Sequence, residues 1–231
     1  MSFKNSYFHS WLWARDDFAL ILPELLGGRA EGSRVIYRTR HKECLLIMPE
    51  ESGFAYPVVF KRYGEKRFFR YLFRPSLAYR EYLGFKAVAE AGIQAAEVLA
   101  LGEKRSFIRL EEAFFVTRYL EGFRDGYEFC LEGCDEGLRD RFIRRNLELL
   151  AKLHGAGLVH GCFHPRNEMF KLSETGEMEV VWIDLASVTR ECRGSRFSRE
   201  EDLGRFLKEF HLGRELESEY EVFYRKESGK Y

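Results

Sequence analysis

An eight-residue run from His160 to Asn167, with the sequence HGCFHPRN, constrains the possible folds of this chain more than any other feature. A predicted strand pair follows it, and the apolar residues 180–183 then lead directly into Asp184. Four apolar residues predict a buried strand, and a carboxylate at the end of such a strand is costly to bury without a partner. The pattern therefore predicts a polar loop beside a strand-terminal carboxylate. The alternatives are a turn or helix cap at Asp184 and a turn residue at Asn167.

The spacing resembles the catalytic and metal loops of kinases, in which His-x-Asp-x-x-x-x-Asn precedes a metal-binding aspartate. This resemblance implies that Asn167 and Asp184 hold Mg²⁺ against the phosphates of ATP. It also implies that His160 supports the loop, while Cys162 and His164 face the acceptor hydroxyl.

Cys162 stands where the kinase pattern has its catalytic aspartate, and a thiol is a poor substitute for a carboxylate at neutral pH. Three interpretations stay open. The protein is a pseudokinase, or it transfers phosphate by positioning alone because a loose transition state needs little from a base, or neighbouring basic groups ionise the thiol. Covalent catalysis by Cys162 is a fourth, less favoured interpretation.

The sequence before this loop reads as a small sheet with one helix, and the sequence around and after it as mainly helical. Strands are expected at 33–40, 44–48, 57–63, 97–101 and 113–118, with a helix at 76–91. Later helices are expected at 139–156, 198–210 and 215–225, with strands at 168–172 and 179–183. The predicted fold is α+β and two-lobed, like a protein kinase: a β-rich lobe over 1–118, a helical lobe over 119–231, and ATP between them.

The predicted β-rich lobe offers candidate nucleotide-binding residues. Lys61, on the third strand, can reach the α and β phosphates, and Glu81 on the following helix would hold that lysine in place. The segment around Thr117 and Tyr119 is the expected hinge, where backbone groups would hydrogen-bond adenine. The alternative for Lys61 and Glu81 is a pair of ordinary surface residues.

Bulk composition narrows the class of partner. Lys and Arg balance Asp and Glu at 37 residues each, so no global charge points to nucleic acid. A local stretch from Lys61 to Arg74 alternates basic and aromatic residues, which suits an anionic inner-membrane surface or a phosphorylated glycolipid. The alternatives are nucleic-acid binding and a solvated helix whose aromatic residues pack on the sheet.

Taken together, these segments resemble the lipopolysaccharide kinase (Kdo/WaaP) family, including its InaA-like members. The resemblance rests on the Lys61 strand, on residues 73–82 around Glu81, on the His160–Asn167 loop with Asp184, and on Asp202 in a later Asp-Leu helix. It implies ATP- and Mg²⁺-dependent phosphorylation of a heptose or Kdo hydroxyl in the lipopolysaccharide inner core. It also implies that Asp202 braces the catalytic loop.

Two departures from kinase patterns accompany this resemblance: Cys162, and a 39–43 segment that lacks the glycines of a phosphate loop. Five scattered cysteines and the lack of a long apolar run favour a reducing cytoplasm, with peripheral inner-membrane contact. The rival functions are a pseudokinase that binds or regulates, and a kinase of a small soluble metabolite.

Overall fold

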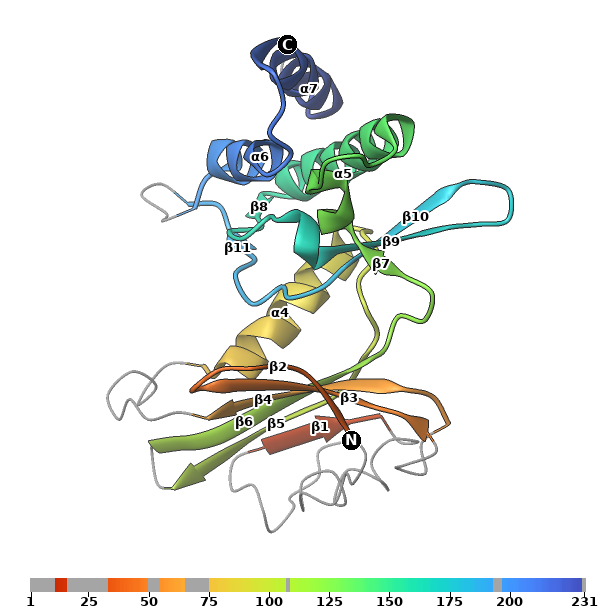
Figure 1. Ribbon diagram of the computed structural model, residues 1–231. Coiled ribbons are helices and arrows are strands. Elements are labelled where there is room, and N and C mark those ends of the chain that lie inside the picture. Colours follow the sequence, from red (N-terminus) through yellow and green to blue (C-terminus); the bar gives the residue numbers. More distant parts are fainter. Residues whose placement is uncertain are drawn as a thin grey trace. The chain divides into compact units, whose positions relative to one another are not determined.

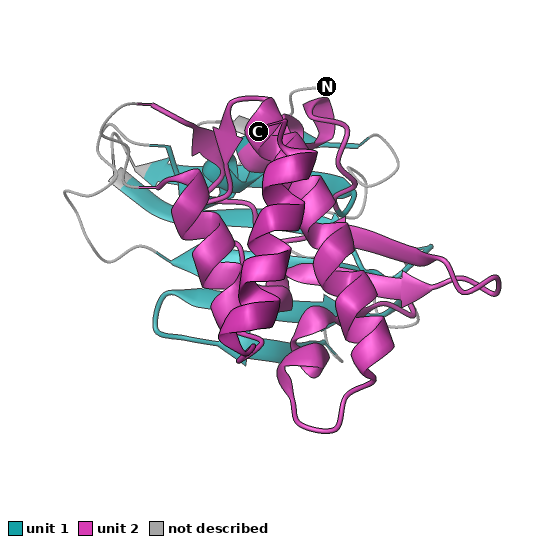
Figure 2. Ribbon diagram, turned by 90° about the horizontal axis from the view of Figure 1, so that it is seen from above, with its two compact units in different colours: residues 1–83, 96–120 teal, residues 84–95, 121–231 magenta. Residues whose placement is uncertain are grey.

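The computed structural model describes residues 11–15, 33–49, 55–64, 75–106, 109–192 and 197–229. The chain forms two compact units, residues 1–83 with 96–120 and residues 84–95 with 121–231 (Figure 2). The division passes through helix α4 (Leu77–Glu90), all of which the predicted lobes assign to the first lobe.

Unit 1 contains a six-stranded antiparallel sheet with the strand order β1-β5-β6-β4-β3-β2 (Figure 1). The predicted meander over 33–63 is confirmed, because β2, β3 and β4 pair in succession. The strand bounds are β1 (Trp11–Ala14), β2 (Arg34–Arg38), β3 (Lys42–Ile47), β4 (Val58–Gly64), β5 (Val98–Ser106) and β6 (Arg109–Arg118).

Strands β5 and β6 form a longer hairpin than the sequence predicts. The first predicted strand ends at residue 101 and the second begins at residue 113, because the apolar residues stop there. In the structure, strand pairing continues to Ser106, which lies opposite Arg109. Most side chains in this extension are charged, and strand propensities predict a loop for such a stretch. Backbone pairing between neighbouring strands, rather than side-chain pattern, sets the ends of this hairpin.

The two faces of this sheet differ in what they bury. One face carries a compact apolar core that includes Ile47, Val58, Phe60 and Phe114. Because side chains alternate along a strand, Lys61 and Tyr63 on β4 point to the opposite face. That face receives the first turns of α4, whose helix begins where the Ser76 hydroxyl accepts a hydrogen bond from the Tyr79 N–H at 3.1 Å.

Unit 2 is mainly helical, as predicted. Its helices are α5 (Glu136–Gly155), α6 (Arg199–Lys208) and α7 (Arg214–Glu227), with 3-10 turns η1 (Gly126–Cys130) and η2 (Pro165–Asn167). Its strands are β7 (Arg124–Asp125), β8 (Leu158–Val159), β9 (Glu168–Leu172), β10 (Met178–Trp182) and β11 (Thr189–Arg190). Helix α5 begins three residues before its predicted start because Asp135 caps it, accepting from the Leu138 N–H at 2.8 Å.

Aromatic side chains fill the core of unit 2 around the predicted catalytic loop. Phe163 and Phe206 are fully buried, with ring centroids 4.5 Å apart, and Phe163 also contacts Trp182 at 5.1 Å. The Trp182 indole N–H donates to Asn146 on α5 at 3.1 Å. Loop and strand are therefore fixed by packing before any ligand binds. None of the described helices is long and apolar enough to span a bilayer.

Candidate active site

The first cluster of candidate residues lies in unit 1 and centres on a buried ion pair. The Lys61 ammonium on β4 lies 2.5 Å from Glu81 Oε1 on α4, as the sequence predicts. The Glu81 side chain is fully buried, and that of Lys61 is 10% exposed. Burial of one partner alone would be costly, so each charge keeps the other in place. The exposed remainder of Lys61 is the part that can meet a ligand.

Tyr63 completes this cluster and was not predicted. Its hydroxyl donates to Glu81 Oε2, so both carboxylate oxygens of Glu81 have a partner. Lys61 and Tyr63 share one face of β4 because they are two residues apart. This i, i+2 spacing was the sequence signal that could have identified the tyrosine.

The expected hinge lies at the end of β6, where Thr117 is buried and Tyr119 is half-buried. The Tyr119 N–H donates to the Pro57 carbonyl at 3.0 Å, and the Arg118 N–H donates to the Glu97 carbonyl at 2.9 Å. These donors are already used within the unit. Adenine at the expected hinge would therefore have to replace one of these two bonds or use other backbone groups of the segment.

The second cluster lies in unit 2, where Asp202 on α6 holds the catalytic-loop backbone. Its Oδ2 accepts from the His160 N–H at 2.6 Å, and its Oδ1 accepts from the Gly161 N–H at 2.8 Å. Arg205, one turn later on α6, donates to the Gly161 carbonyl at 2.9 Å. A buried carboxylate that accepts two main-chain donors fixes the loop directly. This geometry is what the family resemblance implies for Asp202.

Two residues outside the predicted set extend this network. His154, at the end of α5, lies with Nε2 3.2 Å from Asp202 Oδ2 and Nδ1 2.5 Å from the Tyr224 hydroxyl on α7. His154 and Asp202 are both buried, and Tyr224 is nearly so. A chain of side-chain contacts thus joins the C-terminal helix to the loop. Nothing in the local sequence around Tyr224 signals this contact.

His160 is fully buried and neutral. Burial lowers its pKa to about 4, against the opposing influence of Asp202 and Asp184. Its Nδ1 accepts from the Cys162 N–H at 3.4 Å, which places the proton of the neutral ring on Nε2. Nε2 has no hydrogen-bond partner among the described residues. These contacts fit the predicted role of His160, in which the ring packs and orients the loop.

Glycine is required at position 161. Its φ is +75°, and a Cβ there would lie 2.9 Å from the Ser187 carbonyl oxygen. Both the left-handed conformation and the close approach exclude larger residues. The loop can therefore pass close to the segment after Asp184 only with glycine at this position.

The predicted metal-binding residues are brought close together along the backbone. The Ile183 N–H donates to the Asn167 carbonyl at 2.8 Å, so the residue before Asp184 is fixed to Asn167. The Asn167 amide nitrogen donates to the Cys162 carbonyl at 3.2 Å, leaving its oxygen as the atom suited to a cation. Asp184 has a φ of 56°, a conformation uncommon for residues other than glycine.

An oxygen pair from Asn167 and Asp184 fits Mg²⁺, which typically takes one or two protein oxygens and completes its shell with phosphate and water. The described residues contain no group of three or more His, Cys, Asp and Glu side chains that would hold a metal alone. Nucleotide phosphates would therefore have to contribute to the metal site.

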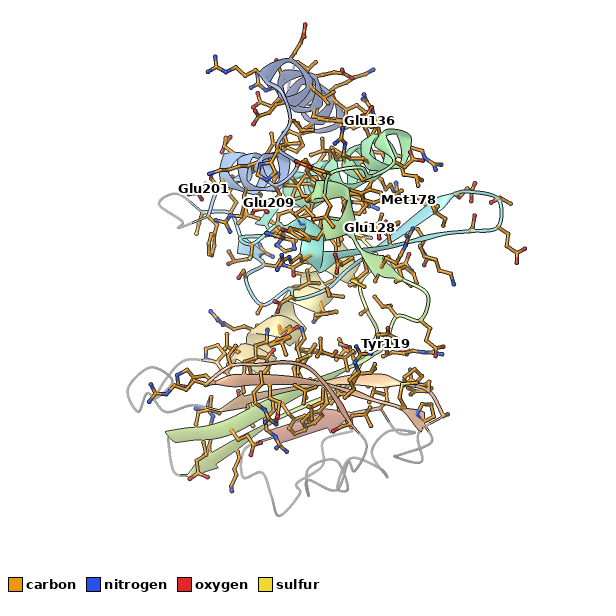
Figure 3. The ribbon with its side chains drawn as sticks, viewed as in Figure 1. Tyr119, Glu128, Glu136, Met178, Glu201 and Glu209 are labelled. Atoms are coloured by element: carbon orange, nitrogen blue, oxygen red, sulfur yellow. The ribbon has the colours of Figure 1, made fainter. Side chains whose placement is uncertain are left out.

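Cys162 is half-buried, and its thiol has no hydrogen-bond partner within the described part of the chain. His164 is held more firmly. Its Nδ1 accepts from the Arg166 N–H at 3.2 Å, and its Nε2 lies 3.2 Å from Oε2 of Glu209. Glu209 follows α6 directly and is labelled in Figure 3. Its ring also stacks on Tyr127 at 6.4 Å between centroids. These contacts fix the orientation of His164 within unit 2.

Glu168, next to Asn167, is a further buried group that sequence reasoning missed. Its Oε1 accepts from the His164 N–H at 3.4 Å, while Oε2 has no partner among the described residues. Full burial raises its pKa well above the usual value, against two backbone hydrogen bonds that lower it. A charged residue at the start of a predicted strand gave no signal that it would be buried.

The predicted basic aromatic stretch is only partly described. Lys61, Arg62 and Tyr63 belong to β4, whereas residues 65–74 lie outside the described residues. Its proposed role at an anionic surface therefore stays a prediction.

The small antiparallel sheet with one helix, the helical unit, and the loop braced by Asp202 define a protein-kinase-like fold. Comparison with known proteins agrees. The sequence profile of the lipopolysaccharide kinase (Kdo/WaaP) family matches residues 65–226, and this chain belongs to that family. The match includes Glu81 and the unit 2 cluster, and it leaves out Lys61.

A similar solved structure with a TM-score of 0.69 shows the same fold. The structure described as WaaP in complex with acyl carrier protein has a TM-score of 0.69 and 16% identity, covering 95% of this chain and 89% of that one. The kinase domain of Mycobacterium tuberculosis PknI has a TM-score of 0.43 and 15% identity, covering 68% and 59% of the two chains. A search of curated proteins finds no match.

Proposed function

We propose that this protein uses ATP with Mg²⁺ to phosphorylate a sugar hydroxyl, of heptose or Kdo, in the lipopolysaccharide inner core. Membership in the lipopolysaccharide kinase family supports the reaction class. The buried Lys61–Glu81 pair is the observation that carries the proposal, because Lys61 lies outside the matched region and is nevertheless placed against Glu81. In this proposal the acceptor is reached at the cytoplasmic face of the inner membrane.

Each residue has a separate role in the proposed reaction. Lys61, oriented by Glu81, binds the α and β phosphates, and backbone groups near Thr117 and Tyr119 bind adenine. Asn167 and Asp184 present oxygen atoms to Mg²⁺, which when bound neutralises charge developing on the transferred phosphoryl group. His160 and Asp202 keep the loop in shape.

Cys162 and His164 are proposed to face the acceptor hydroxyl. An uncharged thiol accepts a proton poorly, so Cys162 would position the hydroxyl rather than deprotonate it. Such a role is sufficient where the transition state is loose and little charge develops on the attacking oxygen. His164 is held by Glu209 and Tyr127 and would restrict where the acceptor can lie.

Calorimetry of Mg-ATP binding tests the nucleotide site without knowledge of the acceptor. The native protein should bind ATP only when Mg²⁺ is present, and Asp184→Asn should weaken binding at least tenfold. Glu174→Gln, in the exposed turn between β9 and β10, is a matched control that should bind like the native protein. A native protein that fails to bind Mg-ATP would contradict the proposal.

Transfer to lipopolysaccharide core oligosaccharide separates an enzyme from a pseudokinase. Phosphorylated product with the native protein supports catalysis, whereas binding without product supports a regulatory module. Cys162→Asp should raise the rate if the cysteine only replaces a missing carboxylate. A sharp fall would show that the thiol itself is required. Phosphorylation of a small soluble metabolite in place of the oligosaccharide would support the remaining alternative.

A further inference from the structure

The turn between β2 and β3 lines an open surface cavity that the proposed reaction does not use. The cavity has a volume of about 420 Å³ and lies entirely in unit 1. Its lining consists of the turn itself, residues 38–43, together with Arg62, Gly64, Glu111 and Glu112 on the neighbouring strands. Pockets that bind small molecules typically have volumes of about 300–1,000 Å³. The size therefore fits a ligand of that kind.

The backbone of this turn has few N–H groups free to bind a ligand, because several of them already hydrogen-bond within the turn. The Thr39 hydroxyl accepts from the Lys42 N–H at 3.0 Å and the His41 N–H at 3.4 Å, and the Thr39 N–H donates to the Lys42 carbonyl at 2.7 Å. A glycine-rich phosphate loop works in the opposite way, with free amides around the anion. Any anion bound here must be held by side chains.

Most charged groups in the lining already interact with other described residues. Arg38 hydrogen-bonds Glu43 at 2.7 Å, Arg62 lies 2.7 Å from Glu112, and Glu111 lies 3.6 Å from Lys104. The Lys42 ammonium lies over the rings of Tyr37 and Tyr63 at 5.2 and 5.6 Å. Arg40 is exposed and makes no ion pair with any described residue. Its guanidinium is therefore available to an anionic group.

The carboxylates of the same lining select the class of ligand. Because Glu43, Glu111 and Glu112 are each paired with a cation, the lining offers an anion little positive charge beyond Arg40, and a triphosphate carries far more charge than one guanidinium neutralises. The remaining lone pairs of these carboxylates can accept hydrogen bonds from neutral hydroxyl groups. A sugar with one phosphate or carboxylate supplies both features, because its anionic group meets Arg40 and its hydroxyls meet the carboxylates.

The pocket adjoins the end of β2, the edge strand of the sheet. All five residues of β2 are exposed, including Val35, Ile36 and Tyr37, at 46%, 49% and 36%. Arg34 at the start of the strand is a second exposed guanidinium without an ion-pair partner in the described ranges. A ligand bound to a larger glycan could therefore extend along this edge.

We propose that the β2–β3 turn binds a phosphate- or carboxylate-bearing sugar of the acceptor glycan, with Arg40 contacting the anionic group. This inference rests on the proposed function and deepens it, because it assigns an acceptor-binding site away from the Lys61–Glu81 face. Arg40 is a binding residue here and takes no part in phosphoryl transfer.

Direct binding tests this site without any transfer. The probe is deacylated lipopolysaccharide core oligosaccharide that carries phosphate, titrated into the full-length protein without ATP. Arg40→Gln should weaken binding about tenfold, as expected for one lost charge-assisted contact. If Arg40 binds a phosphate, removing the phosphate groups from the oligosaccharide should reduce the difference in affinity between the native protein and Arg40→Gln. If Arg40 binds a carboxylate, chemical reduction of the carboxyl groups should reduce that difference instead. Equal affinity of Arg40→Gln and native protein overturns the inference.

The matched control is Arg214→Gln on α7, which also removes one exposed guanidinium that has no ion-pair partner among the described residues. It should bind as tightly as the native protein, and equal loss in both variants would show a general charge effect and overturn the inference. Thermal unfolding of Arg40→Gln should match the native protein, since the side chain is exposed.

Kinetics separate this inference from the proposed function. Arg40→Gln should raise KM for the phosphorylated acceptor about tenfold and leave KM for ATP unchanged. A raised KM for ATP would assign the turn to the nucleotide and overturn the inference while the kinase proposal stands. Arg40-dependent binding of the oligosaccharide by a protein that transfers nothing would instead support the site and contradict the kinase proposal.

Discussion

Glu81 in unit 1 and Asp202 in unit 2 are both buried carboxylates, but their partners are of different kinds. Glu81 meets two side chains, the Lys61 ammonium and the Tyr63 hydroxyl. Asp202 meets two main-chain N–H groups, with His154 as an additional contact. Glu81 orients a cation that is proposed to bind a ligand, whereas Asp202 fixes the path of the backbone. Loss of the first should mainly damage function, and loss of the second should damage folding as well.

The largest expected effect is that of Asp202→Ala. It leaves the His160 and Gly161 N–H groups buried without acceptors, at about 1–3 kcal/mol each, so the unfolding free energy should fall by about 4 kcal/mol. Urea denaturation measures this change. Asp202→Asn retains one acceptor oxygen and should lose about half as much. An unchanged midpoint for Asp202→Ala would show that the loop is held by its aromatic packing alone.

Glu81→Gln should have the next largest effect. It leaves a mostly buried ammonium without its counter-ion, which costs about 3 kcal/mol in buried pairs. Lys61→Met should cost a similar amount, and the double variant should cost less than the sum of the two. Chemical denaturation of all four proteins gives the coupling energy, and additivity would contradict a functional ion pair. ATP binding should weaken in every variant.

The pH dependence of stability should separate the neutral histidine from these charged groups. Burial lowers the pKa of His160 from 6.5 to about 4, so the unfolded chain binds more protons between these pH values. Stability therefore rises with pH over this window and is lost as pH falls, by up to about 3 kcal/mol.

His160→Asn isolates this contribution. The difference in unfolding free energy between the native protein and the variant should change with pH from 6.5 to 4 and stay constant above 6.5. Glu168→Gln should show the opposite pH dependence. Because the carboxyl pKa is raised in the folded protein, the native protein loses stability as pH rises above 4.5, and the variant should not show this loss. Parallel curves for the native protein and His160→Asn would contradict a buried neutral histidine.

Tyr63→Phe should produce the smallest effect and sharpen the comparison most. It removes one hydrogen bond to Glu81 and keeps the ring, so the unfolding free energy should fall by about 1 kcal/mol. The affinity for Mg-ATP should fall only a fewfold, since Lys61 remains paired. Tyr79→Phe on α4 removes a comparable hydroxyl away from Glu81 and serves as the control for ATP affinity. A loss of ATP binding as large as that of Glu81→Gln would make Tyr63 an essential part of the site.

The sequence alone determined the order of the main helices and strands and the pairing of Lys61 with Glu81. Apolar periodicity located α4 and α5, and the HGCFHPRN loop with its strand-terminal Asp184 indicated the family that the comparison confirmed. These features are local, since each depends on residues within a few turns or strands of one another.

Only the tertiary structure decided which atoms satisfy these charges. Tyr63 against Glu81, Tyr224 against His154, and the burial of Glu168 depend on segments far apart in the chain. The β2–β3 turn differs, because its contacts are local: the Thr39 hydroxyl accepts from the amides of His41 and Lys42, which a phosphate loop would leave free. Residue type specifies which polar groups need partners, but packing determines which partner each group meets when water is excluded.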